Sequence, residues 1–382
     1  MKKSILIFDE IIAGHHLEYI HHLYLGAVGD FNNNYVFLLS PDIKNIMKKV
    51  SWPISQNITI AYISDKEANS LINKKHVFRS LVLCSILRKA IDEYKIDSVF
   101  LISLMGFMPF LPFFLNKRVK VSGIIYLIYL YRWNNSNLRS RIGDVIKYIM
   151  FSQSKIFKNI FLLNDNIAPL YLNRKFNTKV FKYLPDPFRP IPNGELKNLR
   201  TELNIAKDKI VCLHFGALTE RKGTLEILNA ILGSNEIVMS KCCFIFAGKI
   251  YEDIKESFYL LVDKAVKKTQ IIIFDYYCDY DFIGSLCITS NYIVIPYKNS
   301  EQSSGVLGYA AQFKIPVIGP NSGLLGKLIK NNKLGYLLKN SSFESLIQFF
   351  NSIESKKIKV NSNYIQQKTI PKFVQAILNH LP

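Results

Sequence analysis

Two series of short apolar runs, with a helix-like segment after most of them, constrain the fold of this chain more than any other feature. Runs of Val, Ile, Leu and Phe of this length are typical of strands buried on both faces of a parallel sheet. Residues 184–194, dense in proline, lie between the two series, and proline at this density stops both helix and sheet. The sequence therefore predicts two doubly wound α/β domains, each binding ligands at the carboxyl ends of its strands.

The pattern also predicts where the elements lie. The first series of strands comprises Ser4–Phe8, Tyr35–Leu39, Ile58–Tyr62, Ser98–Ile102, Val121–Tyr126 and Asn159–Leu163, with an amphipathic helical region over 66–93. The second series comprises strands near 209–215, 242–247, 270–274, 292–296 and 315–318, separated by helices near 223–232, 252–267, 304–313, 322–331 and 342–353. The predicted domains are 1–187 and 188–365, and residues 366–382 are predicted to form a helix that packs back on the first domain.

Composition points to a protein with a large core and reduced thiols. Hydrophobic residues make up 49% of the 382, enough for a large core, and the six cysteines show no Cys-x-x-Cys spacing. Several of the cysteines lie in strand-like runs, which favours buried, reduced thiols in a cytoplasmic protein. The N-terminal residues 1–10 turn acidic too early for a signal peptide and are predicted to form the first strand.

The net charge of +20 indicates which kinds of partner the protein can bind and says little about its fold. Nucleic acid, anionic lipid and phosphorylated substrates all fit it, but no nucleic-acid-binding motif occurs, so nucleic acid is not expected. Two apolar runs, 101–115 and 123–133, flank a basic segment, and both are too short to span a bilayer. They are predicted either to be a core helix and a core strand or to form an apolar surface that docks on an anionic membrane.

Two loops in the second half look suited to holding a phosphate. Glu301 precedes Ser303, Ser304, Gly305 and Val306, where a helix is predicted to begin, and a helix N-terminus favours an anion. The second loop runs from Gly216 to Arg221 and Lys222, where a cation would oppose the dipole of the helix that follows unless an anion lies between them. The plain alternatives are an ordinary N-cap and a solvated lysine.

The first half offers one similar turn, Gly14-His15, after its first strand. The histidine doublets 15–16 and 21–22 invite a metal-site interpretation, but metal-binding pairs on one helix face need i and i+4 spacing. We therefore interpret these histidines as part of an amphipathic helix. No metal or other cofactor is predicted.

Taken in order, these segments resemble the GT-B glycosyltransferases of the family-4-like retaining type, also known as glycosyl transferases group 1. That family has a glycine-rich first turn, a Gly-Arg-x(3–4)-Lys-Gly segment, and a Glu-x7-Glu motif ahead of a Gly-x-Pro-Val strand. Here the corresponding residues are Gly14, Gly216 with Lys222-Gly223, and Glu301 followed by Ile315-Pro316-Val317. The resemblance implies two Rossmann-like domains that face a central cleft and a nucleotide-sugar donor bound by the second domain.

The resemblance also assigns roles. It implies that Lys222 neutralises the departing diphosphate, that Glu301 hydrogen-bonds the donor sugar, and that Tyr276 or Tyr277 stacks on the base. The chain departs from the family at the second glutamate of Glu-x7-Glu, which falls on Tyr309, and at the arginine, which falls on Ala217. No histidine follows the central strand of the first domain, so the group on the acceptor side has no assignment.

One further motif has an alternative interpretation. Asp279-Tyr280-Asp281 spells the Asp-x-Asp that holds a metal in the other large glycosyltransferase fold, but it precedes a predicted helix over 282–288. Helix capping by Asp279 explains it without a metal.

Three functions follow from these patterns. The first is a retaining transferase that moves a sugar from a nucleoside-diphosphate sugar to a glycan or lipid-linked acceptor during polysaccharide assembly. The second is a non-catalytic relative that binds a sugar nucleotide or a partner glycosyltransferase, and the third is a GT-B sugar-nucleotide epimerase. The expected location is the cytoplasm, with docking on the inner face of the plasma membrane as the open alternative.

Overall fold

The computed structural model describes residues 2–11, 15–44, 51–72, 74–133, 136–192, 194, 196–355 and 358–381. The chain forms two compact units, which are described separately. Unit 1 comprises Met1–Pro187 with Thr369–Pro382, and unit 2 comprises Phe188–Lys368.

Unit 1 contains a seven-stranded parallel sheet in the described residues, in the order β3-β2-β1-β4-β5-β6-β7. Its strands are β1 (Lys3–Asp9), β2 (Asn33–Leu39), β3 (Ile58–Tyr62), β4 (Ser98–Leu101), β5 (Lys120–Ile125), β6 (Phe157–Leu163) and β7 (Phe181–Leu184). Its helices are α1 (His16–Val28), α3 (Asp65–Leu71), α4 (His76–Tyr94), α5 (Leu111–Phe114), α6 (Tyr129–Arg132), α7 (Leu138–Gln153), α8 (Ala168–Lys175) and α16 (Ile370–Leu378), with a short 3₁₀ segment, η1 (Leu104–Phe107).

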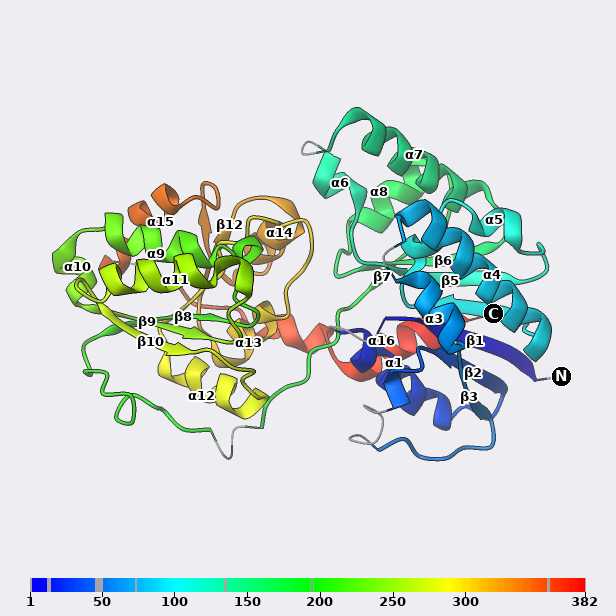
Figure 1. Cartoon of the computed structure of the whole chain (residues 1–382), viewed down its shortest axis with the longest axis horizontal. Coiled ribbons are helices and arrows are strands. Elements are labelled where there is room, and N and C mark those ends of the chain that lie inside the picture. Colours follow the sequence, from blue (N-terminus) through cyan, green and yellow to red (C-terminus); the bar gives the residue numbers. More distant parts are fainter. Residues whose placement is uncertain are drawn as a thin grey trace. The chain divides into compact units, whose positions relative to one another are not determined.

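Helices cover both faces of this sheet, as Figure 1 shows. Side chains of α4, α5, α7 and α8 join one core cluster with the strands, and side chains of α1 and α16 join the other. Helix α16 lies so close to α1 that a Cβ on Gly26 would be 2.3 Å from Val374 Cγ1. This burial of both faces explains why the strands read as continuous apolar runs.

Unit 2 repeats the architecture with a six-stranded parallel sheet in the order β10-β9-β8-β11-β12-β13. Its strands are β8 (Ile210–Phe215), β9 (Cys242–Ala247), β10 (Gln270–Phe274), β11 (Tyr292–Val294), β12 (Val317–Pro320) and β13 (Gly335–Leu338). Its helices are α9 (Thr224–Gly233), α10 (Glu236–Ser240), α11 (Glu252–Ala265), α12 (Tyr280–Thr289), α13 (Val306–Phe313), α14 (Gly323–Asn331) and α15 (Phe343–Phe350), with short 3₁₀ segments η4 (Glu220–Lys222), η5 (Ile353–Ser355) and η6 (Ser362–Gln367). Helices α9, α11 and α15 pack on one face, and α12 and α13 lie on the other (Figure 1).

The two doubly wound sheets confirm the predicted fold class, and the elements differ from the predicted ones in two strands and in region 66–93. Strands β7 and β13 were not predicted. The helical region 66–93 is two helices, because Ile72 adopts an extended backbone after α3 and Ser64 starts α3 with a capping box. All six cysteines are free thiols, and five of them are buried.

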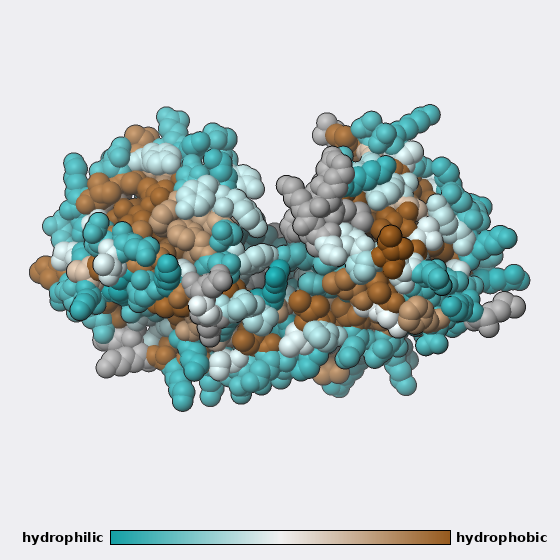
Figure 2. Space-filling model, turned by 90° about the horizontal axis from the view of Figure 1, so that it is seen from below, coloured by the Kyte–Doolittle hydropathy of each residue, from teal (hydrophilic) through white to brown (hydrophobic). Residues whose placement is uncertain are grey.

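The apolar stretch 101–133 belongs to the core of unit 1. Leu104, Phe107, Met108 and Leu111 are buried, and Phe113 is the only large apolar side chain exposed between residues 101 and 133. The core interpretation of this stretch is therefore the one the structure supports. Across the described residues, we find no helix with the length and apolar character needed to cross a bilayer. Figure 2 shows hydrophilic side chains over much of the visible face of each unit, interrupted by apolar patches.

Candidate functional site

Two glycines bring the ends of β8 and β9 together in unit 2. Gly248 has a φ of +138°, and a Cβ there would lie 1.9 Å from the Gly216 carbonyl oxygen. Gly216 itself has a φ of +99°, and a Cβ on it would lie 2.9 Å from Lys222 Nζ. Because only glycine adopts these backbone conformations without strain, the turn after β8 leaves room for the lysine ammonium beside the main chain.

A second loop, between β11 and α13, is tied to this turn by Lys298. The Lys298 N–H donates to the Arg221 carbonyl oxygen at 3.0 Å. Its ammonium group pairs with Glu226 at 2.8 Å and with Glu220 at 3.2 Å. These contacts hold the two loops in register at the carboxyl edge of the sheet.

Tyr297 joins Lys222 to the start of α13. Lys222 Nζ lies 5.2 Å from the centroid of the Tyr297 ring, and the Tyr297 hydroxyl lies 3.4 Å from Ser304 Oγ. The Ser304 hydroxyl in turn accepts from the Val306 N–H, the first residue of α13, at 3.4 Å. The fold thus gathers Gly216, Lys222, Ser304 and Val306, and Ser303 and Gly305 flank Ser304 in the same loop. An ammonium group beside a helix N-terminus suits an anionic group of a ligand.

Glu301 lies in the same loop, half-exposed. Its N–H donates to the Asn299 side chain at 3.2 Å, and among the described residues its carboxylate has no hydrogen-bond partner. The loop is fixed behind it, because the Ser300 hydroxyl lies 2.9 Å from the Ser322 hydroxyl. The carboxylate is therefore free to bind a ligand. The Arg221 side chain, on the other loop, is exposed.

The tyrosines predicted to contact the donor have different surroundings. Tyr276 and Tyr277 are exposed beyond β10, and Tyr276 packs against Phe282 with ring centroids 6.3 Å apart. Tyr309 lies edge-on between Phe188 and Phe215, with centroids 5.4 Å and 5.3 Å away. Tyr309 is thus part of an aromatic cluster. The glycosyltransferase family that the sequence resembles has a glutamate at this position.

The carboxylate Asp275 orders the loop that carries these tyrosines. It accepts from the Ile250 N–H at 2.8 Å and pairs with Lys249 at 3.3 Å. Burial alone would raise the pKa of Asp275, but these two contacts hold it below its usual value. The group therefore stays ionised and keeps the loops after β9 and β10 together.

His214, one residue before the end of β8, is buried beneath the site. Its Nδ1–H donates to the Val294 carbonyl at 2.7 Å, and its Nε2 lies 3.1 Å from the Thr224 hydroxyl. Burial, together with the nearby Lys222 charge, lowers the pKa of His214 to about 4, although the Val294 hydrogen bond raises it. The imidazole is therefore neutral at pH 7 and links β8, β11 and α9.

The first turn of unit 1 contains an Asp–His pair that the sequence alone did not identify, with Asp9 buried and His16 partly buried. His16 opens α1, and its Nδ1 lies 2.7 Å from Asp9 Oδ2 at the end of β1. Burial raises the pKa of the Asp9 carboxyl, although the His16 contact lowers it. Because Nδ1–H donates to Asp9, Nε2 is left to accept a hydrogen bond from another group. Within the described residues Nε2 has no partner.

The residue that the sequence favoured, His15, lies differently. Its side chain is 63% exposed, and its Nδ1 lies 3.2 Å from Glu18 Oε2. Gly14, the other predicted residue of this turn, lies outside the described residues. The contact with Asp9 distinguishes His16 from His15. This contact could not be read from the sequence, because only the fold brings the end of β1 next to the start of α1.

Aromatic hydroxyls surround this pair. The Tyr126 ring lies 5.2 Å from the His16 ring and 6.2 Å from the Tyr19 ring. Tyr19 donates to Asp186, and among the described residues the buried Tyr126 hydroxyl has no partner. An unpaired buried hydroxyl beside an Asp–His pair provides a polar group for a ligand hydroxyl.

Glu10, next to Asp9, faces a cavity of about 300 Å³ at the carboxyl ends of β1, β2 and β3. Its Oε1 pairs with Arg79 at 2.9 Å, and its buried Oε2 has no partner among the described residues. Burial and the adjacent Asp9 charge raise the pKa of Glu10. The cavity therefore combines acceptors with one guanidinium group, a set that suits hydroxyl groups.

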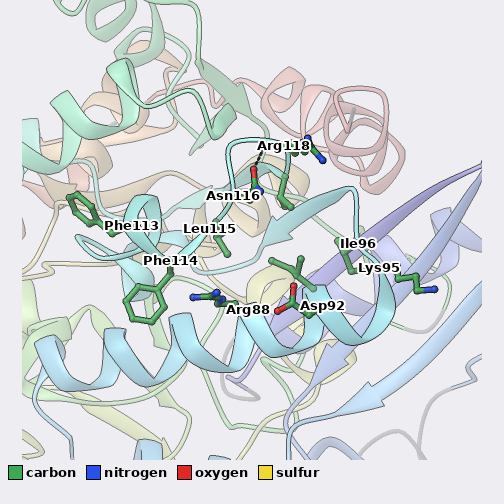
Figure 3. A pocket seen from close by; sticks show the side chains of 11 residues that line it. Arg88, Asp92, Lys95, Ile96, Phe113, Phe114, Leu115, Asn116 and Arg118 are labelled. Carbon is green, nitrogen blue, oxygen red and sulfur yellow. Dashed lines mark hydrogen bonds between the residues drawn. The ribbon is translucent and has the colours of Figure 1, made fainter.

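A different cavity, of about 640 Å³, is shown in Figure 3. It lies between α4, α5 and the turn before β5, and Arg88, Asp92, Lys95, Phe113 and Arg118 are among its lining residues. Because Lys95 precedes β4 and Arg118 precedes β5, it lies at the amino edge of the sheet, and none of the predicted site residues lines it. Parallel sheets bind ligands at the other edge, so we exclude this cavity as the candidate active site.

The metal alternatives have structural explanations. The Asp279 side chain accepts from the Phe282 N–H at 2.8 Å and caps α12, which confirms the capping interpretation. His21 Nε2 lies 3.0 Å from the Ser51 carbonyl oxygen. Nowhere in the described ranges do three His, Cys, Asp or Glu side chains form a group that could hold a metal ion. Independence from metal stays a prediction.

No protein-family model matches the chain, and no curated protein matches it. Solved structures of similar fold do exist. Anabaena Alr3699/HepE in complex with UDP and glucose is 14% identical, with a TM-score of 0.67 over 99% of this chain and 98% of that one. WaaG, a glycosyltransferase involved in lipopolysaccharide biosynthesis, is 14% identical, with a TM-score of 0.62 over 98% of this chain and 95% of that one.

A third similar structure has a different activity assigned to it. It is a Listeria monocytogenes protein proposed to be a UDP-N-acetylglucosamine 2-epimerase, 11% identical, with a TM-score of 0.58 over 98% of this chain and 94% of that one. Identities this low establish the fold alone. The chain has the GT-B fold, built from two Rossmann-like units.

Proposed function

We propose that this protein is a glycosyltransferase that moves a sugar from a nucleoside-diphosphate sugar to an acceptor hydroxyl. The observation that carries the proposal is the arrangement of Lys222, Gly216 and Ser304 around the start of α13, which suits a diphosphate. HepE, a protein of the same fold, has been crystallised with UDP and with UDP-glucose, and this supports a nucleotide-sugar donor.

On the donor side, Lys222 and the N–H groups at the start of α13 neutralise charge that grows on the departing diphosphate. Glu301 accepts hydrogen bonds from donor sugar hydroxyls, and Tyr276 or Tyr277 stacks on the base. Arg221 is exposed beside Lys222 and reaches the outer phosphate. No metal enters this scheme, because the ammonium group and the helix N-terminus supply the positive charge.

On the acceptor side, the proposal assigns His16, with Asp9 fixing its ring, to orient the acceptor hydroxyl through Nε2. The Glu10 cavity holds further acceptor hydroxyls. In a retaining transfer, the bond from the acceptor oxygen to the anomeric carbon forms as the bond to the diphosphate breaks. The hydroxyl proton passes to the departing phosphate oxygen. Retention of the configuration at the anomeric carbon is part of the proposal.

The acceptor class and the location complete the proposal. A glycan or lipid-linked acceptor during polysaccharide assembly fits the basic charge of +20, because such acceptors are often anionic or lie at an anionic membrane. The proposed location is accordingly the cytoplasm, with peripheral attachment to the inner face of the plasma membrane.

Two measurements test the proposed function. Thermal shift with UDP, GDP, ADP and TDP should show stabilisation by at least one of them, as binding to the folded state requires. A panel of labelled nucleotide sugars with and without glycan acceptors should then show release of nucleotide with transfer of sugar, and NMR should show the same anomeric configuration in donor and product. Failure of every nucleotide to stabilise the protein would contradict the proposal.

Two alternatives have specific support. The Listeria structure of similar fold favours a sugar-nucleotide epimerase, which would change the donor without an acceptor. Tyr309 and Ala217, at positions where the resembling family has charged residues, favour a non-catalytic protein that binds a sugar nucleotide or a partner enzyme. An epimerised donor without transfer identifies the first, and binding without turnover of any donor identifies the second.

A further inference from the structure

Helix α7 of unit 1 has an apolar stripe that faces solvent. Leu138, Ile142, Ile146 and Ile149 are 71%, 52%, 49% and 36% exposed. At about 100° per residue these positions fall within roughly 80° of the helix circumference, so they form one continuous line about 16 Å long. The opposite face of α7 packs Tyr148 and Phe151 into the core. The stripe is therefore a second apolar face, unconnected with folding of the unit.

Charge along α7 is entirely positive at its outer surface. Arg139 is exposed, and Arg141 and Lys147 lie on the two flanks between the stripe and the core. The single acidic residue of the helix, Asp144, is buried and accepts from Arg132 Nε at 2.9 Å, so its charge is neutralised. The outer surface of α7 thus combines aliphatic side chains with the exposed positive charge of Arg139.

The first turn of α4 extends this surface. Val77 and Phe78 are 51% and 61% exposed, and Lys74 and Lys75 precede them. Helices α4 and α7 contribute side chains to the same core cluster of unit 1. The same combination of exposed apolar and basic side chains therefore occurs on two neighbouring elements.

We infer that α7, with the first turn of α4, docks this protein on an anionic phospholipid bilayer. Aliphatic side chains enter the boundary between headgroups and acyl chains, and flanking Arg and Lys side chains contact lipid phosphates. A second copy of the chain is disfavoured as the occupant, because it would bring two basic surfaces together. Nucleic acid offers no apolar layer for the stripe. The surface belongs to unit 1 and includes none of the proposed donor residues. The inference gives a surface to the peripheral attachment of the proposed function, but it does not depend on transfer activity.

The test is sedimentation of the full chain with vesicles of phosphatidylglycerol and phosphatidylcholine. Wild type should bind anionic vesicles, and binding should weaken with salt because screening shortens the range of surface charge. The double variant Ile142→Glu with Ile146→Glu should bind at least tenfold more weakly. Ile237→Glu, which changes an even more exposed isoleucine (71%) of α10 in unit 2, is the control and should bind as wild type.

A charge variant separates the two contributions. Arg139→Glu should weaken binding to anionic vesicles severalfold, whereas Lys264→Glu, the same change of sign on α11, should not. Melting temperature and nucleotide binding are measured for every variant as controls for folding. Both should stay at wild-type values, because the substitutions change only the docking surface or exposed control positions. Equal binding of wild type and the double isoleucine variant would overturn the inference. So would a wild-type dimer in analytical ultracentrifugation that the double variant dissociates, since a second copy would then cover the stripe.

Discussion

Lys222 and Gly216 lie so close that a methyl group on the glycine would be 2.9 Å from the lysine Nζ. The left-handed φ of +99° at Gly216 turns the chain at the end of β8, and η4 then carries Lys222 back over this turn. The ammonium group is thereby held against Tyr297 rather than extended into solvent. This arrangement is the basis of the proposed donor-phosphate site.

Lys222→Ala should weaken donor use by one to a few kcal/mol, about the value of a charge-assisted hydrogen bond, because the diphosphate loses its cation. The fold should persist, since the Lys222 side chain has no ion pair within the described residues. Initial rates at low donor concentration measure the effect. Lys264→Ala, an exposed lysine of α11, is the control. Unchanged turnover in Lys222→Ala would remove this residue from the site.

Glu301→Gln should lower transfer by about tenfold or more, roughly 1.4 kcal/mol, because the neutral amide binds sugar hydroxyls less strongly in the transition state. Affinity for the nucleoside diphosphate alone should hardly change. Single-turnover rate and melting temperature are measured on the same sample. If Glu301 only orders its loop, the variant will melt earlier and keep its rate per folded molecule.

His16→Gln should lower transfer by about tenfold or more, the scale of a lost positioning contact, with unchanged binding of nucleoside diphosphate. The matched variant is His15→Gln, which changes the exposed neighbour that the sequence favoured. Transfer rates of the two variants decide which histidine serves the site. A larger loss in His15→Gln would return the role to that residue.

His214 should make unit 2 less stable as the pH falls. Burial lowers its pKa from 6.5 to about 4. Between these two pH values the unfolded state therefore binds a proton that the folded state does not bind. The stabilising contribution is complete above pH 6.5 and is lost as the pH falls towards 4, a change of up to about 3 kcal/mol. Urea unfolding followed by circular dichroism between pH 7 and pH 4 measures the slope.

The control for this prediction is His214→Asn, which retains a donor for Val294 but does not titrate. Its pH slope should be flatter than that of wild type, even if its stability at pH 7 is lower. Both tryptophans, Trp52 and Trp133, belong to unit 1, so fluorescence reports that unit separately and should show the same pH slope in both proteins. Identical circular-dichroism slopes would contradict the assignment.

Activity should survive EDTA, because the proposed site uses Lys222 and the start of α13 in place of a metal. The assay is transfer after dialysis against chelator, with manganese and magnesium added back separately. Complete loss that manganese restores would make Asp279 and Asp281 metal ligands despite the capping contact.

The amino-acid sequence was enough to predict the fold class and to single out the two donor-side loops of the candidate site. Buried parallel strands need apolar side chains on both faces, so runs such as residues 4–8 and 242–247 can be recognised without any tertiary information. The short strands β7 and β13 escaped recognition, because four residues of mixed polarity carry little periodicity. The loops around Lys222 and Glu301 were visible because glycine and serine mark them in the sequence.

Which side chains come into contact depends on the three-dimensional packing of the elements. Asp9 and His16 are seven positions apart on different elements, and their contact depends on how α1 begins over the end of β1. Tyr297 and Gly248 acquire significance because their strands end beside β8. One alternative from the sequence was an exposed apolar surface over residues 101–133. In the structure the exposed apolar stripe lies on α7 instead, because the packing of the helix layer decides which apolar faces are buried. Periodicity identifies a face, but its neighbours determine whether that face meets the core or solvent.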